Sequence, residues 1–492
     1  MSEHFTDRRA FLGSSAAALG YFFTADALSA VRAADTPSEK LRVAGIGVGG
    51  KGDGDINQAS ALMQVVALCD CDRNTLGKQA QRHKGAKTFT DFRRLFDEME
   101  KEFDAVTVST ADHTHAWPSI TAMRMKKHVY CQKPLTQSVS EARLMRETAK
   151  KFGVCTQMGN QGSAADGLRR GVELVQDGLL GKVTEIHVWT NRPIWPQAPG
   201  VMKRPDGADP VPDSLDWEAW IGPAPMRPYK KGVYHPFAWR GWWDFGTGAL
   251  GDMACHTANM AFRACELASP TTIEADATDV NDETYPSSAK IHYEYPKRGD
   301  KPHQGALSFW WYEGKRGGKN VLPAPSLVPG EGEHKDKVCV YFKDDKWFFF
   351  DPNEKNPKRQ LRQVSSGSFI IGEKGVLFSP DDYGAEAFMV TPDGVKKVSD
   401  SKPERLPSNN KGDSGMKEEW VRAIKEGKPE IAYSNFGIAG MLTEAILLGN
   451  VAIRAGKKVE FDAAKVECKN SKEGNQVIKR EYRKGWELTE RA

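Results

Sequence analysis

A glycine-rich run near the amino end of the chain is the first segment with recognisable chemistry. Gly47, Gly49 and Gly52 follow the spacing GxGxxG, and Gly50 lies between them. Glycines at this spacing let the backbone approach a pyrophosphate, and a following helix directs its first N–H groups at the phosphates. The pattern is weak alone. Because an apolar run precedes it and a helix-like run follows it, it predicts a dinucleotide-binding turn.

Asp70 lies at the end of the second strand-like run, where a Rossmann domain places a ribose-binding carboxylate. This carboxylate can accept hydrogen bonds from the adenosine ribose hydroxyls of NAD. It would repel the additional phosphate of NADP, so the sequence favours NAD. Arg73 is close enough to Asp70 in sequence to keep NADP open as the alternative.

Asp252 and His256, four residues apart, form a second candidate site. On a helix such residues share one face, so both side chains could meet one substrate hydroxyl. Oxidation of an alcohol needs a base for the hydroxyl proton while hydride leaves, and a neutral imidazole suits that role near pH 7. An isolated pair of this kind is more often a helix cap and a satisfied histidine, so its meaning depends on the rest of the chain.

Polar and aromatic residues that suit a sugar follow two of the expected elements. Arg240 could bind hydroxyls and Trp243 could stack on a sugar face, although core packing is expected for at least one of Trp242 and Trp243. Asn160 and Gln161 follow a strand-like run, so we expect them at the sheet edge that faces the cofactor and treat them as substrate contacts.

The elements that must position these residues alternate along the first part of the chain. Short apolar runs and helix-like stretches follow one another, which predicts a parallel, doubly wound sheet of the α/β class, a Rossmann domain. The expected strands are 41–46, 65–68, 105–109, 129–131 and 154–158, and the expected helices are 56–62, 73–83, 92–99, 117–125 and 139–152.

From about residue 183 onward the pattern changes to strands joined by turns. The runs 183–190, 272–277, 289–295, 306–312, 338–342 and 347–350 predict a C-terminal α+β domain with a large, mostly antiparallel, open-faced sheet. Segments 193–228 and 315–337 are expected to be surface loops around it, and helices are expected at 416–425 and 436–455. We assign residues 40–160 to NAD binding, 161–459 to a substrate and oligomerisation domain, and 460–492 to a C-terminal tail.

Three further segments make the pattern specific. They are Thr110-Ala-Asp-His-Thr-His115, His128-Val-Tyr-Cys-Gln-Lys-Pro134 and Gly251-Asp-Met-Ala-Cys-His256. Together with the glycine turn they resemble the family of glucose-fructose oxidoreductase, inositol dehydrogenase and related sugar dehydrogenases, from about residue 41 to residue 459. The resemblance implies an NAD(P)-dependent enzyme that acts on a CH–OH group of a sugar, glycoside or polyol, and a homo-oligomer.

The resemblance also assigns roles to individual residues. In that family the lysine of a Glu-Lys-Pro motif contacts the reacting hydroxyl and the cofactor region, and this role passes to Lys133. Gln132 stands in place of the glutamate and removes its charge. The aspartate and histidine of the family match Asp252 and His256, which we expect to orient the substrate and to act as the base. Lys133 would then stabilise the developing alkoxide.

Residues beside these motifs are candidate cofactor contacts. Thr110 and His115 follow a strand near the expected nicotinamide side of the cofactor, and Gln132 adjoins the reactive lysine. For His115 and its neighbour His113, a purely structural role remains equally open. The histidines show no metal-ligand spacing and the eight cysteines no paired framework, so neither a metal site nor disulfides are expected.

Composition and the first residues bear on where this protein works. The 492 residues carry a formal net charge of +4, which gives no reason to expect nucleic acid or an anionic membrane as a partner. Arg8-Arg9 and the small-residue apolar run up to Leu28 predict a twin-arginine signal at residues 1–34. We expect export by the twin-arginine machinery to the periplasm or another exterior location, with a tightly retained cofactor and no stable membrane span.

Three functions use these residues differently. The leading hypothesis is hydride transfer between tightly bound NAD(H) and a carbohydrate hydroxyl. The second is transient oxidation, elimination and re-reduction, which amounts to redox-neutral glycoside cleavage by a glycosidase or lyase. The third is a sugar-binding or scaffold protein that keeps the fold without the chemistry.

Overall fold

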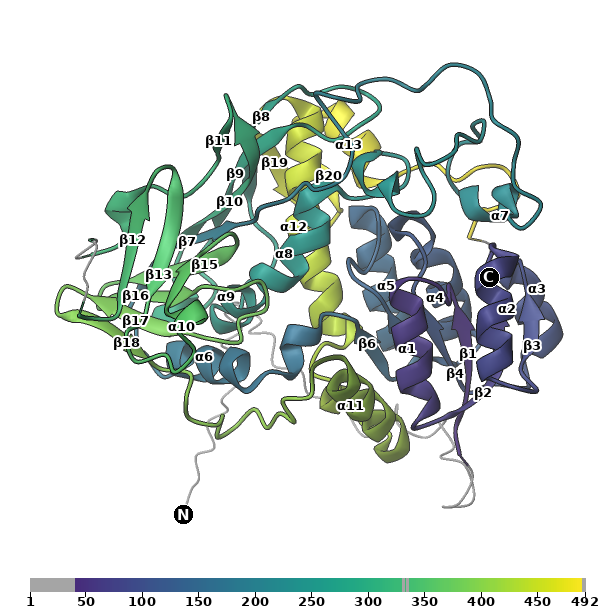
Figure 1. Cartoon of the computed structure of the whole chain (residues 1–492), viewed down its shortest axis with the longest axis horizontal. Helices are drawn as coiled ribbons and strands as arrows, with labels where there is room; N and C mark the ends of the chain where they lie inside the picture. The colour runs from purple at the N-terminus through teal and green to yellow at the C-terminus, as the bar shows by residue number, and fades with distance from the viewer. Residues whose placement is uncertain (1–39, 330–331, 333–335, 489–492) are drawn as a thin grey trace, which may run out of the picture.

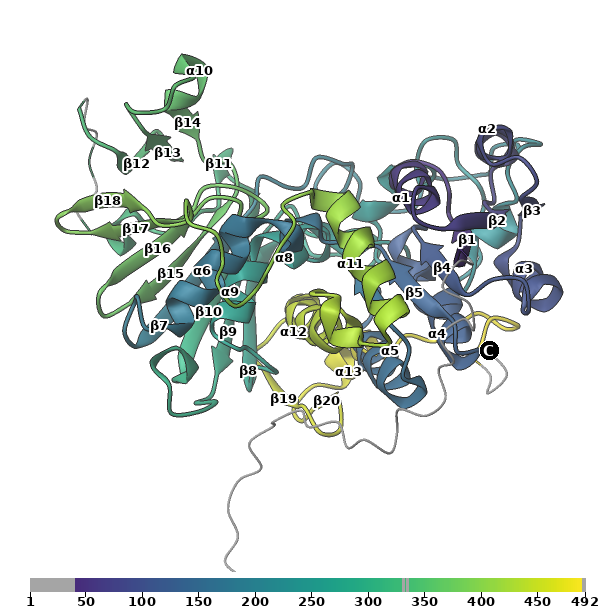
Figure 2. The same cartoon turned by 90° about the horizontal axis from the view of Figure 1, so that it is seen from below.

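The computed structural model describes residues 40–329, 332 and 336–488, in two halves that are each built on a sheet (Figure 1). The twin-arginine segment expected at residues 1–34 lies outside the described residues. Helices of the second half lie between the two sheets, and the views in Figures 1 and 2 agree on this arrangement.

The first half is a six-stranded parallel sheet in the order β3-β2-β1-β4-β5-β6. Its strands are β1 (Arg42–Ile46), β2 (Gln64–Cys69), β3 (Lys87–Phe89), β4 (Ala105–Val108), β5 (His128–Cys131) and β6 (Thr156–Met158). Its helices are α1 (Lys51–Ser60), α2 (Arg73–Arg82), α3 (Phe92–Met99), α4 (Ala116–Arg124) and α5 (Val139–Phe152). The strand order reverses between β1 and β4, where open α/β sheets form a ligand crevice.

The predicted Rossmann sheet is therefore confirmed. β4 and β5 are buried along their whole length, and strands covered on both faces read as continuous apolar runs. The short edge strand β3 was not predicted, because Phe89 is its one buried residue. α5 begins and ends as predicted: the Glu141 carboxylate accepts from Ser138 N at 3.0 Å in a capping box, and Gly153 follows in a left-handed conformation.

The described part of the second half contains an eleven-stranded, mostly antiparallel sheet, which confirms the predicted fold class. The order is β18-β17-β16-β15-β7-β10-β9-β8-β19-β20, with β11 paired to β10, and β7 runs parallel to β10. The strands are β7 (Val183–Trp189), β8 (Thr272–Thr278), β9 (Ser288–Tyr295), β10 (Leu307–Arg316), β11 (Lys319–Asn320), β15 (Gly367–Gly372), β16 (Gly375–Ser379), β17 (Phe388–Thr391), β18 (Gly394–Lys397), β19 (Val459–Asp462) and β20 (Glu467–Cys468).

A separate three-stranded sheet packs on this large sheet, a feature that the run of predicted strands did not reveal. It consists of β12 (Cys339–Lys343), β13 (Lys346–Phe350) and β14 (Leu361–Gln363). Trp347 and Phe349 of β13 pack against Trp189, Phe369 and Phe378 of the large sheet. The apolar faces of the two sheets bury each other, so β12, β13 and β14 stack on the large sheet and do not extend it.

The helices of the second half join the two sheets into one core. They are α6 (Asp166–Gln176), α7 (Trp217–Ile221), α8 (Gly248–Thr257), α9 (Asn259–Ala264), α10 (Pro357–Gln360), α11 (Gly412–Glu426), α12 (Phe436–Ala455) and α13 (Lys472–Ile478). Among the described residues, α12 alone has the length and apolarity of a membrane-crossing helix, but 83% of its apolar window is buried inside the protein. It packs against α5, α8 and β8, as a core helix does.

Residues 193–246, here called the insert, begin beside the large sheet as expected, where Gln197 Nε2 donates to the Pro286 carbonyl at 2.6 Å, but the later part of the insert lies against the first half. Arg73 N donates to the Ser214 carbonyl and Asp216 N to the Cys71 carbonyl, both at 2.8 Å. The insert carries a cluster of buried aromatic side chains that packs against Cys71 and Ala111 of the first half. Burial of these rings holds a segment that composition alone marked as a loop.

Candidate active site

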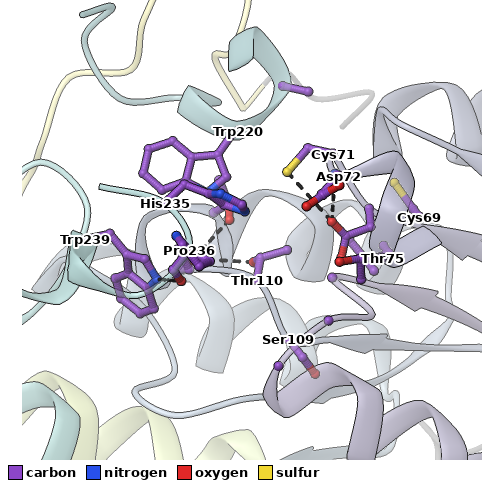
Figure 3. A pocket seen from close by; sticks show the side chains of 18 of the residues that line it. Cys69, Cys71, Asp72, Thr75, Ser109, Thr110, Trp220, His235, Pro236 and Trp239 are labelled. Carbon is purple, nitrogen blue, oxygen red and sulfur yellow. Dashed lines mark hydrogen bonds between the residues drawn. The ribbon is translucent and has the colours of Figure 1, made fainter. Parts of the chain in front are cut away.

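A cavity of about 580 Å³ opens at the carboxyl edge of the parallel sheet, beside the point where the strand order reverses. We call it the dinucleotide cavity. The glycine turn lines one side, and Ser109 and Thr110 line another part of the wall. Figure 3 shows Trp220 and Trp239 of the insert on the side of the cavity opposite Thr75, so the insert forms its roof.

The glycine turn has the shape that a pyrophosphate requires. Gly47 has a φ of 72°, which favours glycine. A Cβ on Gly52 would lie 1.9 Å from the Gly47 carbonyl oxygen, and a Cβ on Gly49 would lie 2.7 Å from Thr75 Cγ2. A Cβ on Gly50 would meet nothing within 4 Å, so the turn is bare toward the cavity. The turn is closely packed on its protein side and has open backbone on its cavity side, which fits a bound dinucleotide.

Asp70 lines the cavity and also holds the turn. Its Oδ2 accepts from Val48 N at 2.9 Å and its Oδ1 from Asp72 N at 3.0 Å. Burial raises the pKa of the Asp70 carboxyl, against the lowering effect of these backbone hydrogen bonds. The remaining lone pairs can accept from ribose hydroxyls. The Arg73 guanidinium donates to the Asp213 carbonyl of the insert at 2.8 Å, so it is engaged away from Asp70, as the preference for NAD requires.

His113 of the first half and the C-terminal tail both hold the insert in place as the roof of the cavity. His113 Nε2 lies 3.0 Å from the Trp220 carbonyl oxygen and Nδ1 lies 3.3 Å from that of Phe245. Burial lowers the pKa of His113 to about 3, so one ring nitrogen of a neutral imidazole donates. Arg483 Nε donates to the Gly222 carbonyl at 3.0 Å. His113 therefore has a structural role, one of the two roles left open.

Lys133, Asp252 and Arg240 meet in one charged cluster, and Arg240 joins this cluster to the cavity that it lines. Lys133 Nζ donates to Asp252 Oδ1 and to the Asp252 carbonyl, each at 2.9 Å, although 119 residues separate them in sequence. Arg240 lines the cavity, and its Nε lies 3.5 Å from Asp252 Oδ1. Burial would raise the pKa of Asp252, but the charges of Lys133 and Arg240 hold it below its ordinary value. The carboxylate thus stays ionised and orients the ammonium.

His256 lies one turn after Asp252 on α8 and is 5% exposed. Burial and the positive charge of Lys133 lower the pKa of His256 well below its ordinary value of 6.5. Its Nδ1 is enclosed by protein without a hydrogen-bond partner among the described residues, which leaves Nε2 as the nitrogen open to a substrate. A neutral imidazole beside a paired lysine can accept a proton from an alcohol.

Asp112 is a buried carboxyl of this cluster that the sequence interpretation did not single out. Its Oδ2 accepts from Thr247 Oγ1 at 2.7 Å, and Thr247 is the N-cap residue of α8. Burial raises the pKa of Asp112 to about 7, and the charges of Arg240, Asp252 and Lys133 also act on it. The position of Asp112 within the motif that follows β4 could have marked it as a site residue, but aspartates are also common in turns.

Of the three expected cofactor contacts beside the motifs, one lines the cavity and two lie behind its wall. Thr110 lines the cavity. His115 is buried behind it, with Nδ1 2.8 Å from the Pro134 carbonyl oxygen and Nε2 3.0 Å from that of Thr110, so it holds the cavity wall against the lysine loop. Gln132 is also buried, and its Nε2 donates to Asp55 Oδ2 at 2.8 Å. The structure therefore places His115 and Gln132 behind the cavity wall.

The expected substrate contacts separate into two regions. Asn160 is buried beside α8: its Nδ2 donates to the Cys255 carbonyl at 3.3 Å, and its Oδ1 has no partner among the described residues. Gln161, itself half-buried, begins the otherwise buried turn that follows. Trp243 packs on Tyr285, with ring centroids 3.8 Å apart, and lines a second cavity of about 310 Å³. The structure does not bring Trp243 into the dinucleotide cavity.

Tyr383 is an aromatic neighbour of the site that lay in no motif. It comes from the loop between β16 and β17, and its ring centroid lies 5.0 Å from that of His256 in an edge-to-face arrangement. With 37% of its surface exposed, the ring offers a flat apolar face beside the histidine. An exposed aromatic face of this kind suits a sugar ring.

The described residues hold no group of three His, Cys, Asp or Glu side chains arranged to bind a metal ion. The eight cysteines are free thiols, and all except the half-buried Cys71 are buried. They therefore pack as small apolar side chains, as the sequence indicated.

Comparison with known proteins places both halves in one group of enzymes. Residues 41–160 match the family model described as "Oxidoreductase family, NAD-binding Rossmann fold". Residues 169–301 match its partner model, "Oxidoreductase family, C-terminal alpha/beta domain". The NAD-binding first domain that Gly47 and Asp70 predicted is therefore confirmed.

Individual relatives match the chain in part. The 2,7-anhydro-N-acetylneuraminate hydratase of Escherichia coli (strain K12) is 30% identical over 96 residues, 19% of this chain and 26% of that protein. The levoglucosan dehydrogenase of Pseudarthrobacter phenanthrenivorans is 23% identical over 203 residues, 41% of this chain and 43% of that protein. The chain thus spans less than half the length of each of these relatives.

Among solved structures, an oxidoreductase domain protein from Kribbella flavida is similar in fold, with a TM-score of 0.55. The two are 17% identical, and the similarity covers 86% of this chain and 99% of that one. At this identity the likeness shows that the two-domain architecture is shared.

Proposed function

Because this chain belongs to the Gfo/Idh/MocA family of oxidoreductases, we propose that it transfers hydride between NAD(H) and a hydroxyl-bearing carbon of a sugar, glycoside or polyol. The observation that carries this proposal is the contact of 2.9 Å between Lys133 and Asp252, which Arg240 joins to the dinucleotide cavity, with His256 one helical turn from Asp252. An ammonium, an ionised carboxylate and a neutral imidazole are the groups that oxidation of an alcohol requires.

Each side chain has a defined part in this reaction. NAD bound in the cavity would supply the hydride acceptor. His256 Nε2 takes the proton of the substrate hydroxyl, because burial and Lys133 keep the imidazole neutral. Lys133 Nζ donates to the substrate oxygen as negative charge develops there, and Asp252 holds that ammonium in place. The same groups act in reverse when a carbonyl is reduced.

The test begins with the bound nucleotide. The purified protein is denatured, the released nucleotide is identified, and the native protein is then screened with sugars, glycosides and polyols while the absorbance of reduced nicotinamide is followed. We expect NAD, and loss of turnover by at least about a hundredfold in Lys133→Met and His256→Ala. Lys374→Met, on the surface, is the matched control. Normal turnover by either site variant would instead support a binding or scaffold protein.

A redox-neutral cleavage is the second candidate. The matched stretch in the anhydro-sugar hydratase of E. coli, 30% identical over 96 residues, favours it, because that protein is named for chemistry without net oxidation. The roofed cavity is also compatible with a nucleotide that is oxidised and reduced again in place. Release of an aglycone from a glycoside without net NADH would identify this activity. Stoichiometric reduction of an added acceptor sugar would identify the oxidoreductase.

Export is a separate part of the proposal. Arg8-Arg9 and the apolar run that follows support a twin-arginine signal and a location in the periplasm or outside the cell. Fractionation of cells that produce the full chain tests this. The wild type should be recovered outside the cytoplasm, and the Arg8→Lys, Arg9→Lys double variant should accumulate within it. Equal distribution of the two would contradict the proposal.

Self-association through the large sheet is also proposed. Trp310 points away from the core that contains Trp311, and it stacks on His292 with ring centroids 4.0 Å apart. Trp310 packs at the border of the cluster formed with the three-stranded sheet, and a half-buried tryptophan at such a border suits an interface between copies of the chain. Light scattering should show an oligomer for the wild type and a smaller species for Trp310→Glu. A monomeric wild type would contradict it.

A further inference from the structure

A buried network around Asp55 lies directly behind the residue that precedes the reactive lysine. Asp55 lies on α1 and is fully buried. Its Oδ1 accepts from Lys417 Nζ at 2.6 Å, and its Oδ2 accepts from Gln132 Nε2 and Ser109 Oγ, both at 2.8 Å. Lys417 lies on α11, 362 residues further along the chain. One carboxylate therefore joins the glycine-turn helix, the lysine loop and a C-terminal helix.

Every charge in this network has a partner. Lys417 also donates to Tyr130 Oη at 3.1 Å, and its ammonium lies 4.2 Å from the centroid of that ring. Burial would raise the pKa of Asp55, but the charges of Lys417 and Lys51 hold it below its ordinary value. Lys51 also pairs with Asp413 of α11. Two cations thus balance two carboxylates, and the fully buried pair among them, Asp55 and Lys417, is sensitive to any added charge.

Neighbouring groups hold both the backbone and the side chain of Gln132. Gln132 N donates to the Val108 carbonyl at 2.8 Å, and Gln132 Oε1 accepts from Lys133 N at 3.3 Å. A Cβ on Gly159 would lie 2.4 Å from Gln132 Nε2, so that side is closed by backbone. Because Lys133 is the next residue, the direction in which its side chain leaves the strand depends on how Gln132 is held.

The chemistry of this contact explains why residue 132 is an amide. Its nitrogen donates to a carboxylate that already accepts from Lys417 and Ser109. A glutamate here would set two carboxylates within about 3 Å of each other and add one unbalanced negative charge to a buried site. Gln132 and Asp55 therefore form a matched pair, in which the carboxylate belongs to Asp55.

We propose that Asp55 and Lys417 are positioning residues for Lys133, acting through Gln132, and that α11 thereby helps to set the geometry of the active site. This proposal rests on the proposed function of Lys133. It makes a reciprocal prediction: Gln132→Glu alone disrupts the site, and Asp55→Asn added to it restores the site. The amide and the carboxylate then exchange places: the net charge and the hydrogen bond between residues 55 and 132 remain, with its direction reversed, and the amide oxygen at position 55 can still accept from Lys417.

The experiment compares the two single variants, the double variant and the wild type, all as full chains. We expect Gln132→Glu and Asp55→Asn each to lower kcat by about tenfold or more with little change in KM, and the double variant to recover to within about threefold of the wild type. Lys417→Met should lower kcat as much as Gln132→Glu or Asp55→Asn does, and Lys417→Arg should retain more activity than Lys417→Met. A double variant no better than Gln132→Glu would overturn the proposal.

A readout that does not need turnover separates this proposal from the proposed function. The rate at which Lys133 is acetylated by acetic anhydride, followed by mass spectrometry, reports the environment of its amine. It should change several-fold in the single variants and return in the double variant. If the wild type oxidises no carbohydrate but this pattern holds, the proposed function fails and the positioning role stands. If labelling of Lys133 is the same in all four proteins, the positioning role fails.

A matched control on the same helix excludes a general loss of stability. Glu419 of α11 pairs with Arg169 at 2.6 Å, and both side chains are 4% exposed. Glu419→Gln breaks a buried ion pair comparable with that of Lys417, but the hydrogen bonds of Glu419 go to Arg169 and Tyr433 and not to Asp55 or Gln132. It should lower the thermal midpoint as Lys417→Met does while leaving the Lys133 labelling rate unchanged. An equal change in labelling would show a merely structural effect and contradict the proposal.

Discussion

Which groups are charged at neutral pH decides what the residues of the site can do. Burial alone keeps an imidazole neutral, whereas a buried ammonium needs a partner. Burial and the charge of Lys133 lower the pKa of His256 well below its ordinary value, so its imidazole is neutral, and Lys133 Nζ donates to Asp252 Oδ1 at 2.9 Å. The site thus holds an imidazole that can accept a proton close to a lysine that is paired with a carboxylate.

Asp112 gives a pH-dependent prediction at this scale. Its folded pKa of about 7 lies above the ordinary value of 3.8, so between these pH values the folded state keeps a proton that the unfolded state has lost. Stability must fall as pH rises through this window. We expect Asp112→Asn, which keeps the acceptor for Thr247, to gain stability relative to the wild type by up to about 4 kcal/mol as pH rises from about 4 to 7.

Chemical unfolding at several pH values measures this difference. The exposed Asp393→Asn serves as the control, because its carboxyl lies on the surface. A constant offset between Asp112→Asn and the wild type over the whole range would mean that Asp112 does not keep its proton in the folded protein.

At the scale of single elements, α1 offers two glycines with opposite roles. A Cβ on Gly52 would lie 1.9 Å from the Gly47 carbonyl oxygen, whereas one on Gly54 would meet nothing within 4 Å. Gly52→Ala must therefore displace the turn, and we expect it to lose the bound nucleotide. Gly54→Ala should retain the nucleotide and gain up to about 1 kcal/mol from helix propensity. The nucleotide content of the purified proteins and their thermal midpoints test both expectations.

The insert and the tail form a second element with a predictable effect. Arg483 N and Nε donate to the carbonyls of Pro223 and Gly222 at 2.9 and 3.0 Å, which fastens the roof of the cavity. Trp486 is buried beside Phe92 and Trp117 and anchors this end of the tail. We expect the nucleotide to leave when the roof lifts, so a weaker fastening should speed its release.

Arg483→Ala and Trp486→Ala should each release bound NADH at least about tenfold faster than the wild type. Stopped-flow fluorescence with excess NAD as competitor measures this rate. Lys469→Ala, on an exposed part of the tail, should release NADH at the wild-type rate. Unchanged release from both tail variants would show that the cavity opens by another route.

At the scale of the whole molecule, the two halves share one core. Residues of the parallel sheet, of α8 and α12 and of the large sheet belong to a single apolar cluster. Arg143 of α5 donates to the fully buried carboxylate of Glu444 on α12 at 2.6 and 2.8 Å, which ties the halves together. A continuous core of this kind should unfold as one unit.

We therefore expect one cooperative transition in calorimetry and a large effect of Glu444→Gln. Removing the charge leaves the half-buried guanidinium of Arg143 without its carboxylate, which should cost about 3 kcal/mol. The surface pair of Arg94 and Glu98 gives the contrast, because both side chains are about half exposed or more. Glu98→Gln should cost less than about 1 kcal/mol. Two separate transitions, or equal costs, would contradict the shared core.

The sequence by itself determined the elements and the chemistry-bearing residues within them. Strand runs of the first half, the glycine turn and the ends of α5 follow from local spacing, because caps, glycines and apolar periodicity act between residues a few positions apart. The same holds for Asp252 and His256, which share a helix face at four-residue spacing. The predicted fold class and NAD-binding domain needed no knowledge of distant contacts.

Only the tertiary structure decided which of these elements meet. It joined Lys133 to Asp252 across 119 residues and Lys417 to Asp55 across 362. It also turned an expected loop into the roof of the cavity and placed Asp112 beside the charged cluster of Lys133, Asp252 and Arg240. Such contacts depend on how packed surfaces fit together in three dimensions, and a one-dimensional pattern of polar and apolar residues does not carry that information.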